Sequence, residues 1–403
     1  MGTIMDHDAI VIGAGPAGLF AATEIAKRGF HVRVLEEHEH VGEPDHCAGL
    51  LSTSGLARLG LRMPEGIIQN TVSGARIYSP SGSSVTIERG EREACVIDRR
   101  RFDAWLANRA IDSGVDVTTN SKATGFTGEG SLVRTIRVKD KNENELKSKC
   151  FIVAEGSRCC LSRSAGLPAV EKSSMYPAFQ YEVSGVNLDE DVVEMFYGRN
   201  VAPGFFAWII PLGENRARVG LAARNRSRTR LDALITHHKI LARRLDGAKI
   251  ERSLGGIVLV GMPIAKLTHR NVLAVGDTAG IVKATTGGGV ILGGITARIA
   301  GKTVAEALSR DARVGGIKQY EKQCKSMVFN ELRTMYLTQR ALSSLSDKGL
   351  DSVIKDAAEL GFLDVVKSEG DMDLQGKVIK RLVTDPRMIL MGLRAIRYIN
   401  PFL

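Results

Sequence analysis

The stretch "DAIVIGAGPAGLFAATEIAKRGFHVRVLEE" (residues 8–37) decides how the chain begins to fold. Residues 8–12 form a short apolar run of the kind found in buried parallel strands. The turn "GAGPAG" (13–18) follows, and a helix is expected to about Arg28, with Gly29 as its stop. Residues 31–37 have the pattern of a second strand. The order strand, turn, helix, strand predicts a βαβ unit and a Rossmann-like domain.

The glycines of this turn match the GxGxxG fingerprint of dinucleotide-binding sites. Gly13 permits a tight turn, Gly15 lets the backbone approach a pyrophosphate, and Gly18 lets the helix pack closely on the strand. The helix start, which includes Ala17, directs free N–H groups and the positive end of the dipole toward the phosphates. Glu36 ends the second strand and is placed to accept hydrogen bonds from ribose hydroxyls. A glycine turn of purely structural use is the alternative.

Composition limits the class of protein. The chain has 403 residues, 44% hydrophobic and 25% charged, which is typical of a soluble globular protein with two or three domains. The start lacks the pattern of a secretory signal. The longest uncharged stretches, 200–213 and 284–297, have 14 residues each and contain glycines, whereas a spanning helix needs about 20 apolar residues. We therefore expect a cytoplasmic protein that is not an integral membrane protein.

The cysteines show no CxxC spacing, so we expect free thiols and no metal site. They are Cys47, Cys95, Cys150, Cys159, Cys160 and Cys324.

The net charge of +10 is uneven, because residues 376–403 hold six basic residues and one acidic residue. As a helix, this tail places three arginines on one side and three apolar residues on the other: Arg387, Arg394, Arg397, and Ile389, Leu393, Ile396. Such a helix either lies on an anionic membrane surface or docks on the protein by its apolar face. Nucleic acid is not an expected partner, because aromatic residues are only 5% of the chain and no basic run is interleaved with them.

Further along the chain the pattern changes twice. A strand ending at Asp98 precedes a helix over 99–113, and 150–156 again reads as a parallel strand. Four strands separated by turn residues between 175 and 224 predict an antiparallel second domain. A basic helix is expected over 231–245, a strand over 271–277, a long helix over 288–309, and helices from 310 to 403. The expected domain ranges are 1–172 and 255–310 for dinucleotide binding, 173–254 for the antiparallel domain and 311–403 for the C-terminal helices.

A second glycine-rich segment, "VGDTAGIVKATTGGGVILGG" (275–294), follows the strand at 271–277. A carboxylate, Asp277, comes after a buried strand, and three consecutive glycines open a helix. Since glycine disfavours helix, three together need a reason. Clearance and N–H donors for a large planar ring supply one, and a flexible lead into the helix is the alternative.

Taken together, these segments resemble the geranylgeranyl reductase family of flavoproteins, and most of all the archaeal digeranylgeranylglycerophospholipid reductases, within the p-hydroxybenzoate hydroxylase type of fold. The resemblance covers about residues 8–300. It implies FAD as the cofactor, with its ADP part on 13–18 and Glu36, Arg99 of "VIDRRRFDAWLA" (96–107) as a further contact, and Ala123 near the adenosine. Asp277 would lie near the ribityl–phosphate chain.

The resemblance also places the flavin ring. Gly288, Gly289 and Val290 would crowd it at the mouth of a helix, and "DHCAGLLS" (45–52) would bring Cys47, Ala48 and Leu50 against the cofactor. "PGFFAWIIP" (203–211) matches the family's substrate-domain strand, YxWxFP, so Phe206 and Trp208 are expected to line an apolar slot. Packing in the core is the alternative for these two aromatic residues.

The implied activity is the saturation of C=C bonds in the geranylgeranyl chains of membrane-lipid precursors, in archaeal-type isoprenoid ether-lipid biosynthesis. It needs a hydride from N5 of reduced FAD and a proton, for which Cys47 is the catalytic candidate. The implied partners are the lipid, the inner face of the cell membrane as a peripheral surface, and an electron donor such as ferredoxin, reduced deazaflavin or NADPH.

Three departures from the related patterns bear on this. Glu155-Gly156 stands where flavin hydroxylases have Asp-Gly, which argues against direct use of NADPH. Gly280 and Ala284 replace their histidine and proline, which argues against a flavin monooxygenase acting on an aromatic or isoprenoid substrate. Phe206 and Ile210 replace the tyrosine and phenylalanine of YxWxFP, so the strand loses a hydroxyl. A flavoprotein or lipid-binding module without activity is the remaining alternative.

Overall fold

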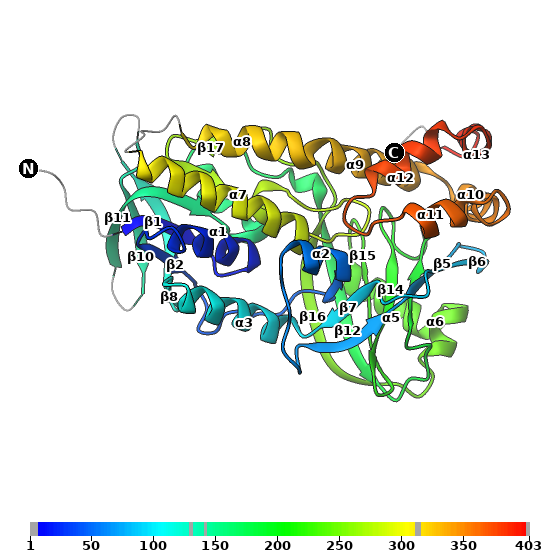
Figure 1. Ribbon diagram of the computed structural model, residues 1–403. Coiled ribbons are helices and arrows are strands. Elements are labelled where there is room, and N and C mark those ends of the chain that lie inside the picture. The colour runs from blue at the N-terminus through cyan, green and yellow to red at the C-terminus, as the bar shows by residue number, and fades with distance from the viewer. Residues whose placement is uncertain (1–6, 129–131, 141–142, 311–315, 400–403) are drawn as a thin grey trace, which may run out of the picture. The chain divides into compact units, whose positions relative to one another are not determined.

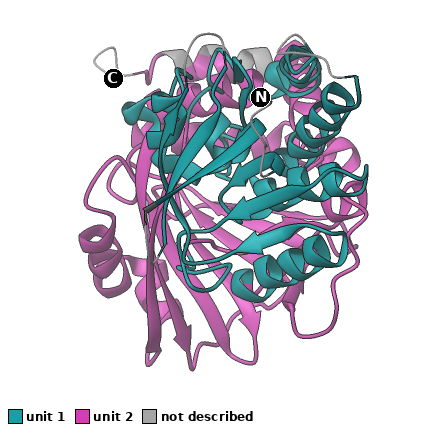
Figure 2. Ribbon diagram, turned by 90° about the vertical axis from the view of Figure 1, so that its left-hand side faces the viewer, with its two compact units in different colours: residues 1–45, 99–174, 261–332 teal, residues 46–98, 175–260, 333–403 magenta. Residues whose placement is uncertain are grey.

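The computed structural model describes residues 7–128, 132–140, 143–310 and 316–399, and it divides into two compact units (Figures 1 and 2). Unit 1, teal in Figure 2, comprises Met1–Asp45, Arg99–Ser174 and Gly261–Leu332. Unit 2, magenta, comprises His46–Asp98, Met175–Val260 and Arg333–Leu403. Each unit is therefore assembled from three separate segments of the chain.

Unit 1 contains a mostly parallel sheet. Its strands are β1 (His7–Ile12), β2 (Val32–Leu35), β8 (Asp116–Thr118), β9 (Lys122–Thr127), β10 (Thr135–Lys139), β11 (Glu143–Val153), β17 (Thr268–His269) and β18 (Val272–Ala274). Strands β18, β11, β1, β2 and β8 lie side by side in that order and run parallel. Because β1 pairs with β2 on one side and with the much later β11 on the other, the strand order reverses next to β1. Open α/β sheets bind ligands at such a reversal.

The helices of unit 1 are α1 (Pro16–Ala26), α3 (Arg99–Asp112), α4 (Cys160–Ser164), α7 (Val290–Ser309) and α8 (Lys318–Cys324). Short 3-10 turns at Gly156–Arg158, Lys172–Ser174 and Gly276–Ala279 and a π-helical segment at Lys325–Phe329 complete it. Helices α1 and α7 lie side by side (Figure 1). A Cβ on Gly301 would lie 2.3 Å from the Ala21 carbonyl oxygen, so the glycine allows this close approach. The predicted βαβ opening is confirmed.

Unit 2 contains an antiparallel sheet in the strand order β16, β12, β15, β14, β13, β5, β6. Its strands are β5 (Gly74–Tyr78), β6 (Ser84–Glu88), β12 (Met175–Ser184), β13 (Val192–Phe196), β14 (Ala207–Gly213), β15 (Arg216–Ala222) and β16 (Lys249–Leu259). Strands β3 (Leu50–Ser52), β7 (Ala94–Ile97) and β4 (Ile68–Val72) form a smaller sheet. The prediction of four antiparallel strands between 175 and 224 is confirmed by β12 to β15.

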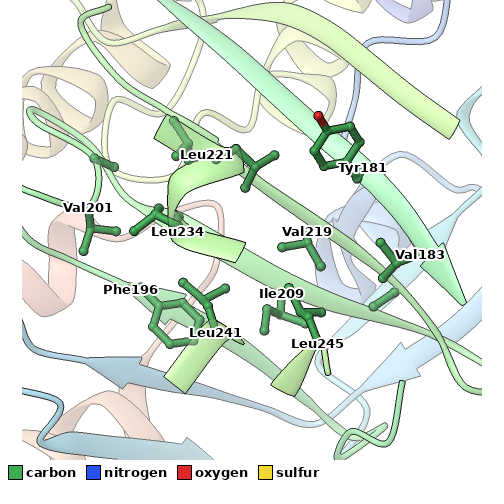
Figure 3. Packing of buried hydrophobic residues seen from close by; sticks show 14 of the residues in the cluster. Tyr181, Val183, Phe196, Val201, Ile209, Val219, Leu221, Leu234, Leu241 and Leu245 are labelled. Carbon is green, nitrogen blue, oxygen red and sulfur yellow. The ribbon is translucent and has the colours of Figure 1, made fainter. Parts of the chain in front are cut away.

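One face of the large sheet forms the core of unit 2. Side chains from β12, β14 and β15, such as Tyr181, Ile209 and Val219, meet Leu234 and Leu241 of helices α5 (Ser227–His237) and α6 (Lys239–Arg244) (Figure 3). Because side chains alternate along a strand, the residues between them point to the other face. The basic helix expected over 231–245 is two helices, since His238 has extended backbone and its ring accepts the Leu241 N–H at 3.3 Å.

The two units divide the chain differently from the expected domain ranges. Residues 46–98 belong to unit 2, because β5 pairs in parallel with β13 and so joins the antiparallel sheet. Residues 333–403 also belong to unit 2. They comprise most of α9 (Asn330–Ser344) and all of α10 (Asp347–Glu359), α11 (Phe362–Glu369), α12 (Gly376–Thr384) and α13 (Pro386–Ile396). The short helix α2 (Thr53–Arg58), which follows the Cys47 region, also belongs to unit 2.

The basic C-terminal segment forms α12 and α13, as expected of a helical tail. Ala395 of α13 is buried against Leu345 and Leu350, and Arg394 lies 3.5 Å from Asp356 of α10. Helix α13 is therefore docked on the other C-terminal helices. The side chains of Ile389, Leu393 and Ile396, on which the predicted apolar face rests, lie outside the described residues.

Across the described residues, every helix is too short or too polar to cross a membrane. The same residues bring together no cluster of three or more histidine, cysteine or carboxylate side chains that could hold a metal ion.

Candidate functional site

In unit 1 the predicted cofactor residues follow the ends of neighbouring parallel strands. Gly13 comes directly after β1, Glu36 after β2 and Asp277 shortly after β18. The carboxyl ends of parallel strands meet at one edge of a sheet, so residues 264 positions apart in sequence are brought to the same edge. This edge, beside the reversal of strand order, is the candidate cofactor site.

The glycine turn shows what each glycine contributes. Gly13 has φ +99°, and a Cβ there would lie 2.3 Å from the Ala154 carbonyl oxygen. A Cβ on Gly18 would lie 2.1 Å from the Gly13 carbonyl oxygen. A Cβ on Gly15 would meet nothing within 4 Å. Gly13 and Gly18 are thus required by packing, whereas Gly15 leaves its backbone open to a ligand at the start of α1.

Glu36 holds this turn in place. One carboxylate oxygen accepts the Ala14 N–H at 2.9 Å, and the other accepts the His38 backbone N–H at 3.0 Å and contacts the His38 ring nitrogen at 2.6 Å. The carboxylate therefore ties the end of β2 to the glycine turn after β1. A carboxylate oxygen can accept more than one hydrogen bond, so a ribose hydroxyl can still be accommodated.

Ala123 is brought to the same region by main-chain bonds. Ser121, two residues earlier, donates its N–H to the Glu36 carbonyl at 2.7 Å, and Lys122 donates to Glu37 at 2.8 Å. Ala123 itself is half-buried near the start of β9. Its expected place beside the adenosine is therefore compatible with the position of Glu36, and its contact with the cofactor stays a prediction.

Arg99 begins α3 and pairs with Asp103 one turn later, at 3.1 and 2.9 Å. Burial raises the pKa of Asp277, and the positive charge of Arg99 opposes that shift. The guanidinium and the two carboxyl groups thus share one electrostatic environment in unit 1, and the contact of Arg99 with the cofactor stays a prediction.

The three consecutive glycines before α7 have separate local causes. Gly287 has φ +73°, a conformation that other residues rarely adopt. A Cβ on Gly288 would lie 2.8 Å from Cε of Lys283, and a Cβ on Gly289 would lie 2.8 Å from Oδ1 of Asp277. Part of the reason for this run is therefore packing against the preceding loop, which the sequence pattern did not reveal. The buried Lys283 was also missed, although it is the one charged residue of 278–297 and so a visible signal.

Glu155 has a structural task. Its carboxylate accepts the backbone N–H groups of Cys160 and Leu161, each at 2.9 Å, and of Ser162 at 2.8 Å. It therefore caps the start of α4, and the methylene by which glutamate exceeds aspartate adds to its reach along the chain.

The residues of unit 1 fit an FAD molecule on three counts. Helices α1 and α7 both begin without a side-chain cap, so their first N–H groups face outward at the site. Gly15 leaves open space, and Glu36 is fixed at the end of β2, beside the glycine turn. Which of these residues touch FAD stays a prediction.

In unit 2, the segment of residues 46–49, here called the Cys47 loop, is held by the large sheet. Gln180 donates to the Cys47 carbonyl at 3.1 Å, and Arg218 donates to the Ala48 carbonyl at 2.8 Å. The Gly49 N–H donates to Sγ of the half-buried Cys47 at 3.3 Å. Leu50 then begins β3 and pairs with Val96. Neither Gln180 nor Arg218 was predicted, and their only signal was a polar residue at alternate positions of an apolar strand.

All six cysteines are free thiols, as predicted, but they differ in environment. Burial raises the pKa of Cys150 and of Cys324 to about 12, and it also raises the pKa of Cys95. These thiols stay protonated. Cys160 is exposed and Cys47 is half-buried.

The two predicted slot residues are mostly buried in unit 2. Phe206 stacks on Phe205 with 4.3 Å between ring centroids and lies 5.5 Å from the Tyr197 ring. Trp208 is 8% exposed, and its indole N–H donates to Gln180 at 3.3 Å. Both side chains therefore take part in packing, and a role in substrate binding stays a prediction.

Another residue near this strand was missed from the sequence. Gln339 of α9 is buried and donates to the Gly204 carbonyl at 2.8 Å, two residues before Phe206. Its Oε1 has no hydrogen-bond partner within the part of the chain that the structure describes. An unpaired buried acceptor is a candidate contact for a polar group of a ligand.

Comparison with known proteins agrees with this geometry. A family model described as "FAD binding domain" matches residues 6–334. A digeranylgeranylglycerophospholipid reductase of Methanocaldococcus jannaschii is 31% identical over 95% of this chain and 96% of its own length. The protein named digeranylgeranylglycerophospholipid reductase 2 of Methanopyrus kandleri is 30% identical over 94% of this chain and 97% of its own.

A solved structure has the same architecture along nearly the whole chain. It is described as a geranylgeranyl bacteriochlorophyll reductase-like protein from Thermoplasma acidophilum, with a TM-score of 0.85 and 26% identity. The match covers 96% of this chain and 99% of that one. Both units, and not the cofactor unit alone, therefore have counterparts in these proteins.

Proposed function

We propose a function from one premise: the chain belongs to the FAD-binding domain family and, within it, to the family of the digeranylgeranylglycerophospholipid reductases. The function is the FAD-dependent saturation of C=C bonds in the geranylgeranyl chains of a membrane-lipid precursor. The observation that carries it is the extent of the similarity, 94–97% of both chains, which includes the antiparallel sheet and the Cys47 loop of unit 2 as well as the cofactor site of unit 1.

An isolated alkene has no carbonyl to accept electron density, so its two carbons need a hydride and a proton almost together. Reduced FAD, when bound, supplies the hydride. We propose that the Cys47 thiol supplies or relays the proton, because an S–H group can act as a general acid and the sheet holds the loop that carries it. The Gly49 N–H, which donates to Sγ, stays available to the sulfur after the proton has left.

Phe206 and Trp208 would provide the apolar surroundings in which the prenyl chain is held. Little free energy is needed to order these two side chains, since Phe206 already stacks on Phe205 and Trp208 already packs against Phe206. Gln339 would then offer its unpaired acceptor to a hydroxyl of the lipid or to a water molecule.

The proposed activity is tested by mass spectrometry. Protein loaded with FAD is reduced chemically without oxygen and incubated with a geranylgeranyl lipid, and the lipid is examined for successive gains of two hydrogens. Cys47→Ala should lower the rate roughly 100-fold, in the range of lost general acid catalysis, without loss of FAD. Cys160→Ser, at the exposed cysteine, serves as the matched control and should keep full activity. Unchanged lipid with the unmodified protein would reject the function, and unchanged turnover in Cys47→Ala would reject the role of the thiol alone.

The electron donor is proposed to be a ferredoxin, a reduced deazaflavin or NADPH. Anaerobic loss of the visible absorbance of bound FAD, followed with each donor in turn, distinguishes them. Glu155 is engaged in capping α4, so we expect NADPH to be the slowest of the three.

We further propose that the protein works at a membrane surface, where its lipid substrate resides. The support is the basic C-terminal segment, in which Arg387, Arg394 and Arg397 are exposed. Anionic lipids attract such groups by about 1 kcal/mol for each basic residue near the surface.

A further inference from the structure

We propose that Gln180 and Arg218 are positioning residues that clamp the Cys47 loop and so fix the reactive thiol. The inference rests on the proposed function, because it extends the role given there to Cys47. It arises from the face of the large sheet that points away from the core of unit 2.

That face carries an unusual set of buried polar side chains. Tyr181 and Val183 of β12 point into the core (Figure 3), so Gln180 and Glu182 lie on the opposite face. By the same alternation on β15, Val219 is in the core and Arg218 is opposite. In the sheet register, Gln180 pairs with Gly220 and Glu182 with Arg218.

Arg218 is 1% exposed and makes four hydrogen bonds in different directions. It donates to Glu182 at 2.9 Å, to the Ala48 and Ile97 carbonyls at 2.8 and 3.0 Å, and to Gln69 at 2.7 Å. Burying a guanidinium is costly, and it is tolerated only when charge and donors are both satisfied. Arg218 therefore does more than fill space in the core, because it joins the Cys47 loop, β7 and the large sheet through its hydrogen bonds.

Glu182 balances the charge. Burial alone would raise its pKa, but hydrogen bonds from Arg252 and Arg218 and the charges of both arginines lower it to about 2. Arg252 donates to this carboxylate at 2.6 and 2.8 Å. The carboxylate is therefore ionised at any physiological pH, and it keeps Arg218 in place.

Gln180 lies on the same face of the sheet as Glu182, two residues earlier on β12. It is 3% exposed, and the Trp208 indole N–H fixes the orientation of its amide by donating to its oxygen. Its N–H group then points at the Cys47 carbonyl. Gly220 makes room for this pair, since a Cβ there would lie 2.5 Å from Gln180 Cβ and 2.7 Å from Trp208 Cζ2. Trp208 thus supports the loop through Gln180, whatever else it contacts.

The loop is fitted to this clamp at every residue. His46 contacts the Gly255 carbonyl at 3.0 Å. A Cβ on Gly49 would lie 2.4 Å from Nη1 of Arg218, and Gly49 has φ +73°, so both space and conformation require glycine. With two successive carbonyls turned toward the sheet, Gly49 presents its N–H to Sγ of Cys47. The clamp therefore sets the hydrogen bond that the sulfur receives.

In the proposed step the S–H bond breaks and a C–H bond forms with the electron pair of the alkene, while the hydride reaches the other carbon. The sulfur keeps the electron pair of the S–H bond and is reprotonated from water. A hydrogen bond to the resulting anion is stronger than one to the neutral thiol. Loss of the clamp should therefore lower kcat and leave less of the thiol ionised at neutral pH, so that Cys47 is alkylated more slowly there.

The first test follows alkylation of Cys47 by iodoacetamide across a range of pH. Cys160→Ser is used as the background, because Cys160 is the exposed cysteine. In this background Gln180→Met and Arg218→Lys should shift the midpoint of the alkylation profile upward by about one pH unit. The rate at neutral pH should then fall about tenfold, since only the thiolate reacts. Arg216→Met, which removes a half-buried arginine of the same strand that pairs with Glu214, is the matched control and should leave the profile unchanged.

The second test measures turnover of the geranylgeranyl lipid and FAD content. Gln180→Met and Arg218→Lys should lower kcat about tenfold with little change in KM or FAD, and neither should have a further effect when Cys47 is alanine. Variants that keep the alkylation profile and kcat of the parent, even with a lowered melting temperature, would reduce the clamp to a structural role and overturn the inference. The alkylation test needs no lipid turnover, so the clamp can be confirmed or rejected even if the proposed function fails.

Discussion

In unit 1 the candidate cofactor residues lie on backbone turns at the ends of parallel strands, whereas in unit 2 the Cys47 loop is held from outside by side chains of a sheet. The first site depends on the absence of side chains, as at Gly13, Gly15 and Gly18. The second depends on two long polar side chains, Gln180 and Arg218, and on the partners that satisfy them. A cofactor that brings its own chemistry needs open backbone, while a reactive thiol needs a fixed position.

The largest effect is expected from a substitution in the glycine turn of the candidate cofactor site in unit 1. Gly13→Ala would place a Cβ 2.3 Å from the Ala154 carbonyl oxygen. Such overpacking costs about 1–3 kcal/mol, and roughly 10- to 100-fold in affinity for FAD follows if the turn shifts. Gly29→Ala is the matched control, because Gly29 also has φ +82° but has nothing within 4 Å of a Cβ. Titration of the apoprotein with FAD, followed by flavin fluorescence, measures both. Equal losses in the two variants would mean that backbone strain, and not the collision, matters.

A smaller effect is expected when acid lowers the stability of unit 2 by protonating Glu182, the partner of Arg218. The pKa of Glu182 is lowered from 4.5 to about 2, so its ionised form stabilises the folded state. Since the folded pKa lies below the unfolded one, this contribution is complete above about pH 4.5 and is lost as the pH falls toward 2. We expect about 3 kcal/mol of the stability of unit 2 to disappear over that range.

Urea unfolding at several pH values measures this loss. The chain has two tryptophans, so a Trp105→Phe background leaves Trp208 of unit 2 as the fluorescent reporter. Glu182→Gln should be less stable at neutral pH and less sensitive to acid between pH 4.5 and 2. If the two proteins lose stability in parallel over this range, Glu182 does not anchor the clamp.

The site in unit 1 depends on local turns and the site in unit 2 on distant side chains, so the sequence alone predicts the first better than the second. The turn at 13–18, Glu36 and Asp277 could be proposed as cofactor residues because each stands at a fixed distance from a strand, which a local pattern is enough to recognise. Gln180 and Arg218 contact a loop more than 130 residues earlier, and only the register of β12 with β15 places them behind it. The packing causes of Gly288 and Gly289 were missed for the same reason, because they depend on where the Lys283 and Asp277 side chains lie.

The boundaries of the two units show most clearly that a local sequence pattern does not reveal pairing between distant segments. Residues 74–78 have no feature that separates them from the neighbouring cofactor unit, yet they pair with β13 of unit 2. A parallel pairing between distant segments leaves no local mark in the sequence. The βαβ opening, the antiparallel strands and the long helix after the triple glycine, in contrast, were predicted from their local sequence patterns and confirmed.

The smallest expected effect concerns the C-terminal helices of unit 2. Arg394→Gln with Arg397→Gln should weaken binding to vesicles that contain anionic lipid by about 1 kcal/mol for each charge, and raised salt should have the same effect on the parent protein. Arg28→Gln, just after α1 in unit 1, is the control with an equal change per charge. Sedimentation with vesicles measures binding. Equal weakening by the control would mean that overall charge, and not the C-terminal segment, attracts the protein to the membrane.

The most direct test of the whole account is an anaerobic single turnover. Protein with chemically reduced FAD is mixed with a geranylgeranyl lipid in the absence of oxygen, and the visible absorbance of oxidised flavin is followed. We predict that the absorbance returns when lipid is added, with one equivalent of flavin oxidised for each double bond saturated, and that the return is slow in Cys47→Ala. Flavin that stays reduced until oxygen is admitted would contradict the account.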